Sequence, residues 1–187
     1  MTKVAILSSH NGSGFNALYE ASVKKELDIE ITLLISNNSN SLALKNAKKY
    51  GIKTQLVNNK TNENPDETIF SLLKESECTY IFLSGYMKKI STKITENFTI
   101  LNSHPALLPK YGGKGMYGNY VHEAVLQNKE QMTGVTIHEV NAVYDEGKIL
   151  LQKEIAVLES DTVESLASKV KELEQLAIVE AFKECLK

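Results

Sequence analysis

The sequence predicts an α/β fold with one doubly wound, mostly parallel sheet of about seven strands and an antiparallel addition near the C-terminus. Three observations predict it. Apolar runs alternate with helix-like segments through the first half, two later strands are joined by a loop too short for a crossover, and a long amphipathic segment closes the chain. The 187 residues, 42% of them hydrophobic, suit one core, so residues 1–187 are predicted to form a single domain.

Four strands are predicted in the first half, and a helix is predicted after each of them. The strands are KVAIL (3–7), IEITLLIS (29–36), KTQLV (53–57) and TYIFLSG (79–85). The helices are FNALYEASVKKEL (15–27), SLALKNAKKYG (41–51), TIFSLLKES (68–76) and a short one within KKISTKITEN (88–97). The polar segment NNKTNENPDE (58–67) is predicted to be a loop.

The second half is predicted to complete the sheet and to cover it. A fifth strand, FTILNS (98–103), comes before a glycine-rich loop and the predicted helix GNYVHEAVLQ (118–127). QMTGVTIHEV (131–140) and KILLQKEIAV (148–157) are predicted to pair antiparallel across NAVYDEG. The closing helix begins near Asp161, which forms a predicted capping box with Glu164.

Composition excludes several classes of protein. The net charge of -2 gives no reason to expect nucleic acid or a membrane surface as a partner. All 21 basic residues are lysine, so any anion is held by ammonium groups, hydroxyls or backbone N–H groups. The two cysteines fit no zinc or disulfide pattern, and no segment reads as a signal or a membrane span. We therefore expect a cytoplasmic protein, and its oligomeric state is expected to be a monomer or a homodimer.

The turn NGSG, residues 11–14, joins the first predicted strand to the first predicted helix. Ligands bind open α/β sheets at such strand ends, and a helix N-terminus with glycines and a hydroxyl suits a phosphate. The spacing is neither GxGxxG nor a P-loop, so dinucleotide binding is disfavoured. The alternative is that the glycines only allow a sharp turn.

Asn102 and His104 project to the same side of the fifth strand, because residues two apart share a face. An amide and an imidazole side by side can stabilise an oxyanion and transfer a proton. Pro105 then takes the chain out of the strand. The alternative is that both side chains only satisfy loop carbonyls.

Asp145, in the loop NAVYDEG, is a candidate partner for His104, since a nearby carboxylate stabilises a protonated imidazole. No GxSxG elbow is present, so a serine nucleophile is not expected. The remaining histidines lack HExxH spacing, and we expect no metal. They are His10, His122 and His138.

Four motifs along the chain resemble those of the phosphoribosylglycinamide formyltransferases, within the folate-dependent formyltransferase family. They are NGSG (11–14), GYMKKIS (85–91), NSHPALLPKYGG (102–113) and YDEGKILLQ (144–152). The resemblance covers essentially the whole chain and implies a Rossmann-like formyltransferase fold. It implies formyl transfer from N10-formyltetrahydrofolate to the primary amine of glycinamide ribonucleotide, which gives formylglycinamide ribonucleotide and tetrahydrofolate in de novo purine (IMP) biosynthesis.

The resemblance also implies roles for single residues. Asn102 would stabilise the oxyanion, His104 would be the general acid, and Asp145 would hold His104 in its protonated form. The residues implied to hold the ribonucleotide are Gly12, Ser13, Gly14 and Glu174. Those implied to contact the folate are Met87, Lys88, Lys89, Ile90 and Asn102, with backbone groups of residues 138–145 reading the pterin.

The chain departs from the family pattern at several positions. Gly14 stands where asparagine is frequent, and Lys88 replaces a usual arginine, which changes the donors offered to the phosphate and the folate. Lys89 stands where an apolar residue is common. The glycine-rich segment 112–119 is expected to be a mobile flap near the substrates.

Other functions stay open at this stage. The acceptor could be a sugar nucleotide or a tRNA, and hydrolysis of formyltetrahydrofolate is a further alternative. These activities are disfavoured because their enzymes normally carry additional domains. A non-catalytic phosphate-binding module is the alternative from another class, and His138 could be a packed strand residue.

Overall fold

The computed structural model describes residues 1–187 as two compact units. The first comprises Met1–Leu101 with Leu186, and the second comprises Asn102–Cys185 with Lys187. The strands form one seven-stranded sheet in the order β3-β2-β1-β4-β5-β6-β7. This confirms the predicted α/β class and mixed sheet, while the single domain stays a prediction.

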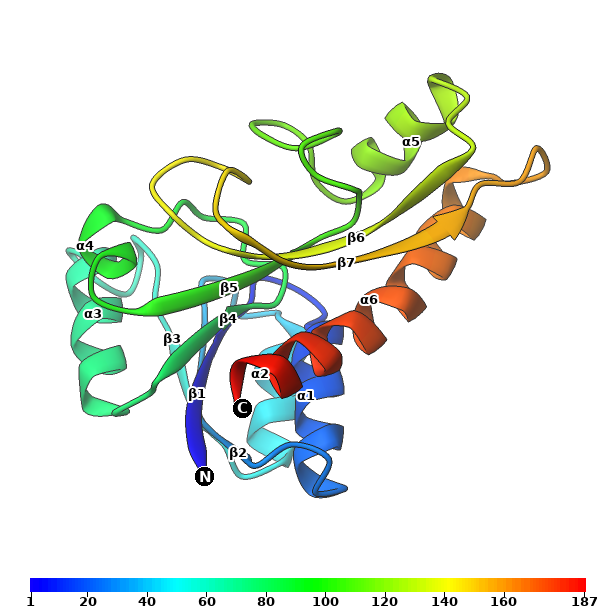
Figure 1. Ribbon diagram of the computed structural model, residues 1–187. Helices are drawn as coiled ribbons and strands as arrows, with labels where there is room; N and C mark the ends of the chain where they lie inside the picture. Colours follow the sequence, from blue (N-terminus) through cyan, green and yellow to red (C-terminus); the bar gives the residue numbers. More distant parts are fainter. The chain divides into compact units, whose positions relative to one another are not determined.

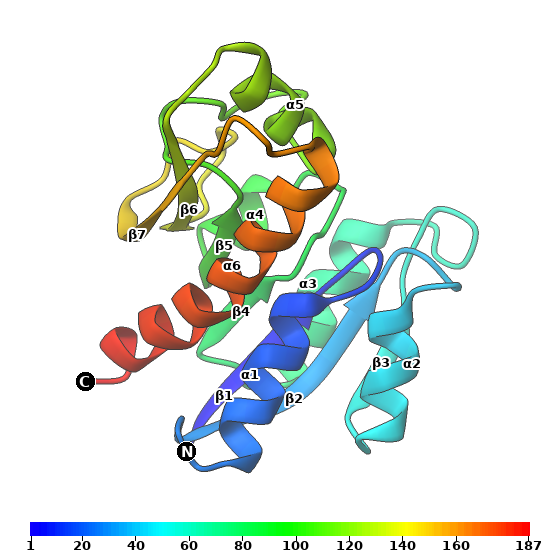
Figure 2. The ribbon, with the colours of Figure 1, turned by 90° about the vertical axis from the view of Figure 1, so that its right-hand side faces the viewer.

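The first unit contains a parallel sheet covered on both faces. Its strands β1 to β4 pair parallel, and their bounds are Thr2–Leu7, Ile29–Ser36, Lys53–Leu56 and Tyr80–Leu83. Helices α1 (Ser13–Val23) and α2 (Leu42–Lys49) lie on one face of these strands, and α3 (Pro65–Glu75) lies on the other (Figures 1 and 2). The strands are apolar because both faces are covered. A one-turn helix, α4 (Thr92–Thr95), follows β4.

Two helices of the first unit differ from the prediction at their ends. Helix α1 ends at Val23, not near residue 27, and Lys25 has the left-handed φ of 59°. Helix α3 begins at Pro65, inside the predicted loop 58–67. The Asn64 side chain accepts a hydrogen bond from Glu67 N, and proline fits the first turn because its missing N–H has no partner there.

The second unit is built on the end of β5 (Thr99–His104), which begins in the first unit. It continues through α5 (Asn119–Gln127), β6 (Met132–Glu139), β7 (Ile149–Ala156) and α6 (Val163–Cys185). Strands β6 and β7 pair antiparallel, as predicted. Helix α6 packs against α5 and both strands. In Figure 1 the paired strands β6 and β7 run side by side above α6.

The predicted capping box at the start of α6 is wrong by one residue. Thr162 Oγ1 accepts from Ser165 N at 3.2 Å, and Ser165 Oγ accepts in return from Thr162 N at 3.0 Å. The reciprocal pair is therefore Thr162 and Ser165, not Asp161 and Glu164. Asp161 accepts instead from Leu158 N and pairs with Lys169 at 2.6 Å, which helps lower its pKa to about 2.

Among the helices, none combines the length and apolar character that crossing a membrane requires.

Candidate active site

The end of β5 carries Asn102 and His104 on one face and Ser103 between them. His104 is 3% exposed, whereas Asn102 and Ser103 are half-buried. The chain leaves the strand at Pro105, after which the loop is fixed by side chains of β6 and β7. Leu108 N donates to Thr136 Oγ1 at 3.0 Å, and Gln152 Nε2 donates to the Leu108 carbonyl at 2.9 Å.

The His104 ring has a different neighbour at each nitrogen. Nε2 lies 2.7 Å from the backbone carbonyl of Tyr111, and Nδ1 lies 3.6 Å from Oδ2 of Asp145. Because a carbonyl oxygen only accepts, Nε2 carries the proton in this hydrogen bond. Nδ1 is therefore the nitrogen that can gain and lose a proton.

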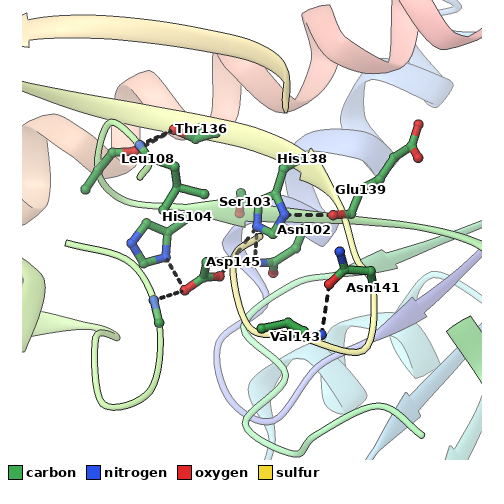
Figure 3. Close-up of polar contacts among 12 residues, drawn as sticks. Asn102, Ser103, His104, Leu108, Thr136, His138, Glu139, Asn141, Val143 and Asp145 are labelled. Atoms are coloured by element: carbon green, nitrogen blue, oxygen red, sulfur yellow. Dashed lines mark hydrogen bonds and ion pairs between the residues drawn. The ribbon is translucent and has the colours of Figure 1, made fainter. Parts of the chain in front are cut away.

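Asp145 lies between two histidines (Figure 3). Its Oδ2 faces His104, and its Oδ1 lies 3.6 Å from Nε2 of His138. Oδ2 also accepts a hydrogen bond from Gly113 N at 2.8 Å. The residue has the left-handed φ of 58°, which aspartate tolerates better than most side chains. One carboxylate thus faces His104, His138 and the glycine-rich segment together.

His138, at the end of β6, contacts the same group. Its Nδ1 lies 2.9 Å from the Glu139 carbonyl, and its Nε2 lies 3.2 Å from Nδ2 of Asn102. Burial lowers the pKa of His138, although the Glu139 carbonyl and Asp145 act in the opposite direction. A neutral ring with its proton on Nδ1 accepts from the Asn102 amide and fixes its direction.

The sequence leaves open whether His138 is only a packed strand residue, and the structure places its ring against Asn102 and Asp145. The available signal was its position at the end of a strand, the same signal that selected Asn102 and His104. Nothing in the sequence showed that β6 brings its ring against Asn102.

His122 is the other buried histidine of the second unit. It lies on α5, is 4% exposed, and its Nδ1 has no hydrogen-bond partner. Burial and the neighbouring His104 lower its pKa.

The structure contains no group of three or more His, Cys, Asp or Glu side chains able to hold a metal ion.

Glu174, from the middle of α6, contacts the β5 residue between Asn102 and His104. Ser103 Oγ donates to Oε1 of Glu174 at 2.5 Å. Burial raises the pKa of Glu174, and the hydrogen bond from Ser103 partly offsets this. The second unit therefore brings Asn102, His104 and Asp145 together on one side of β5, with Glu174 bonded to Ser103.

The predicted phosphate turn lies in the first unit. Gly12 is the N-cap of α1 and has the left-handed φ of 66°. No side-chain cap accepts from the N–H groups at this helix end. A Cβ at Gly12 would lie 2.5 Å from the Cβ of Ala43, so this position excludes every other residue type without rearrangement. Phe15 N, in the first turn of α1, donates to Ser84 Oγ at 3.0 Å.

The segment after β4 lies beside this turn in the first unit. Ser9 N donates to the Gly85 carbonyl at 3.1 Å, and Met87 N donates to Ser9 Oγ at 2.8 Å. Met87 is exposed, as are Lys88 and Lys89, whereas the Ile90 side chain is buried. Of the four residues predicted to contact folate here, three present side chains at the surface.

Comparisons with known proteins decide the family. A family profile described as formyl transferase matches residues 2–182. The chain belongs to the formyl transferase family. Its fold agrees with that of a solved phosphoribosylglycinamide formyltransferase from Anaplasma phagocytophilum, at 32% identity and a TM-score of 0.87, over 97% of this chain and 85% of the other.

Other members of the formyl transferase family are similar along most of this chain. A chloroplastic phosphoribosylglycinamide formyltransferase from Vigna unguiculata is 37% identical, over 95% of this chain and 59% of the relative. This chain thus spans less than two thirds of that plant protein. The phosphoribosylglycinamide formyltransferase from Haemophilus influenzae is 31% identical, over 93% of this chain and 82% of the relative.

Proposed function

We propose that this formyl transferase moves the formyl group of N10-formyltetrahydrofolate to the primary amine of glycinamide ribonucleotide. The products are formylglycinamide ribonucleotide and tetrahydrofolate, in de novo purine biosynthesis. The observation that carries the proposal is the cluster of Asn102, His104 and Asp145 at the end of β5. The names of the similar proteins support this choice of acceptor.

The proposed reaction needs an oxyanion donor and a proton carrier. The amine attacks the formyl carbon, whose carbonyl oxygen becomes negative in the tetrahedral intermediate. Collapse of the intermediate breaks the bond from carbon to N10, which takes up a proton while the amine loses one. The Asn102 amide has two N–H donors; one is directed at His138, and the second serves the oxyanion.

His104 is proposed to be the general acid through Nδ1, because its Nε2 is engaged by the Tyr111 carbonyl. Asp145 faces Nδ1 and stabilises the positive charge of the imidazolium. The same carboxylate accepts from Gly113 N, so its position depends on the glycine-rich segment as well as on its own loop.

The substrate contacts are proposed from the resemblance. Gly12, Ser13 and Gly14 would hold the ribonucleotide phosphate with N–H groups and a hydroxyl at the start of α1. Glu174 would contact the same substrate, while Met87, Lys88, Lys89 and Ile90 would contact the folate. A cytoplasmic monomer or homodimer also stays a prediction.

An acceptor comparison tests the proposal. Purified protein is supplied with N10-formyltetrahydrofolate and with no acceptor, glycinamide ribonucleotide, an amino-sugar nucleotide or glycinamide alone, and formylated product is measured by mass. We expect rapid transfer to glycinamide ribonucleotide only. Transfer to the sugar nucleotide instead would overturn the acceptor, and turnover without any acceptor would indicate a hydrolase.

A non-catalytic phosphate-binding module predicts a different result in the same assay. It would bind the ribonucleotide without forming any formylated product. It would also bind equally well after substitution of His104, because binding at the α1 turn does not depend on that imidazole.

A further inference from the structure

Ser103 occupies a position in the β5 motif to which no role has been given. Its neighbours Asn102 and His104 point to one side of the strand, so its side chain points to the other. There its hydroxyl donates to Glu174 Oε1 at 2.5 Å. The strand that carries the proposed catalytic pair is therefore bonded, through its opposite face, to a carboxylate proposed to contact the substrate.

Glu174 is held at both ends, its backbone by packing of α6 and its carboxyl group by the hydrogen bond from Ser103. The residue lies in the middle of α6, and its neighbours one turn away, Val170 and Ile178, are fully buried. The backbone of Glu174 is thus held by core packing, and its carboxyl group by the strand. A hydroxyl bonded to a carboxylate at this distance is a short, charge-assisted hydrogen bond. Such a bond favours the ionised form, whereas burial raises the pKa of this group.

The chemistry of Glu174 limits which part of a ribonucleotide it can bind. A carboxylate repels a phosphate and accepts only from N–H and O–H donors. The ribose offers two adjacent hydroxyl groups. With Oε1 occupied by Ser103, Oε2 is the oxygen that can accept from them.

We propose that Ser103 is a positioning residue for the ribonucleotide: its hydroxyl holds Oε1 of Glu174 so that Oε2 accepts from the ribose hydroxyls. This inference rests on the proposed function, because it takes glycinamide ribonucleotide as the acceptor. Ser103 itself touches neither the formyl group nor the amine. Its effect is therefore on the binding of one substrate and not on the chemical step.

The test combines variants at Ser103 with acceptors that lack one ribose hydroxyl. Ser103→Ala removes the hydrogen bond, and Ser103→Thr keeps the hydroxyl on a β-branched side chain that suits a strand. We expect Ser103→Ala to raise KM for the ribonucleotide about tenfold, typical of a lost hydrogen bond to a charged group. kcat and KM for the folate should change little, and Ser103→Thr should restore most of the affinity.

A matched control comes from the start of α6, where Ser165 Oγ also donates to a carboxylate, Oδ1 of Asp161, at 2.8 Å. Ser165→Ala should reduce thermal stability without changing KM for either substrate. A merely structural hydroxyl at position 103 would behave in the same way as this control.

The deoxy acceptors give the decisive readout. The unchanged chain should bind the 2′-deoxy or 3′-deoxy acceptor about tenfold more weakly than the ribose form, and Ser103→Ala should lose most of that preference. If Ser103→Ala weakened the binding of the ribose and deoxy acceptors by the same factor, the proposal would be overturned. If Ser103→Ala does not fold, Glu174→Gln serves as the second variant, and it too should lose the preference.

Failure of this inference can be told apart from failure of the proposed function. If the unchanged chain does not formylate glycinamide ribonucleotide at all, the proposed function fails and the inference fails with it. If the unchanged chain does so and Ser103→Ala leaves the ribose preference intact, only the inference fails.

Discussion

The two units contain proposed functional groups of opposite kinds. In the second unit, Asn102, His104, His138 and Asp145 form a cluster in which side chains contact side chains. In the first unit, the turn at Gly12 offers mainly backbone N–H groups. The Ser8 hydroxyl donates to a backbone carbonyl, and the Ser9 hydroxyl accepts from Met87 N and donates to the Asn37 side chain. Chemistry at the cluster depends on side-chain identity, whereas binding at the turn depends on backbone conformation.

This difference predicts different consequences of substitution. Removing a side chain from the cluster should reduce the rate of the chemical step and leave the backbone in place. Adding a side chain at the turn should deform the backbone and so affect stability and substrate binding together.

The largest effect is expected from substitution within the cluster. His104→Ala should lower kcat by about a hundredfold to ten-thousandfold, the range typical for loss of a general acid. Asn128→Ala is the control, because Asn128 only donates to the Ala124 carbonyl at the end of α5. Steady-state rates and melting temperatures are measured for both. A His104→Ala protein that keeps its rate would show that the cluster is not catalytic.

Asp145→Asn tests the charge of the cluster with little change in shape. An amide oxygen can still accept from Gly113 N, so the loop should keep its conformation while the negative charge beside His104 is lost. We expect kcat to fall by about tenfold to a hundredfold. Asp161→Asn is the matched control. It loses the ion pair with Lys169 and should lower stability while kcat stays the same.

Gly12→Ala tests the turn. The left-handed φ should cost about 1–2 kcal/mol, and the contact with Ala43 should cost about 1–3 kcal/mol more. Gly51→Ala is the control, because its φ of 76° is also left-handed but nothing lies within 4 Å of an added Cβ. Chemical unfolding should therefore show a larger loss for Gly12→Ala, which should also bind the ribonucleotide more weakly. Equal losses in stability would mean that the turn relaxes around the added methyl group.

The smallest effect concerns pH. His122 has a pKa lowered by burial, so below about pH 6.5 the unfolded chain takes up a proton that the folded chain resists. Stability should fall as the pH decreases below that value. His122→Gln should lose fewer degrees of melting temperature than the unchanged chain between neutral pH and pH 5.5. The dependence of melting temperature on pH should weaken only in part in this variant, because burial also lowers the pKa of His138.

The mostly parallel sheet and the β5 motif were predictable because local patterns indicate them, whereas the order of the strands came only from the structure. Alternation of strands and helices predicted the parallel sheet, and spacing of two predicted the shared face of Asn102 and His104. The end of α1 and the start of α3 were not placed correctly. The ends of helices depend on single residues, such as Lys25 with its left-handed φ and Asn64 with its capping side chain. The spacing of apolar residues does not reveal such local features.

Contacts between distant segments could not be predicted from spacing. That Asp145 lies 3.6 Å from His104 depends on the antiparallel pairing of β6 with β7 and on a left-handed φ at Asp145 itself. The bond from Ser103 to Glu174 depends on how α6 packs across the second unit. Such contacts follow from tertiary packing, which no local pattern records.

The central claim is that Asn102 and His104 act on one transition state. Single-turnover formyl transfer to glycinamide ribonucleotide tests it most directly, measured for Asn102→Ala, His104→Ala and the double variant, each first shown to be folded. Residues that act as a unit give non-additive losses, so the double variant should be about as slow as the slower single variant. Transfer by both single variants at close to the rate of the unchanged chain would contradict the account.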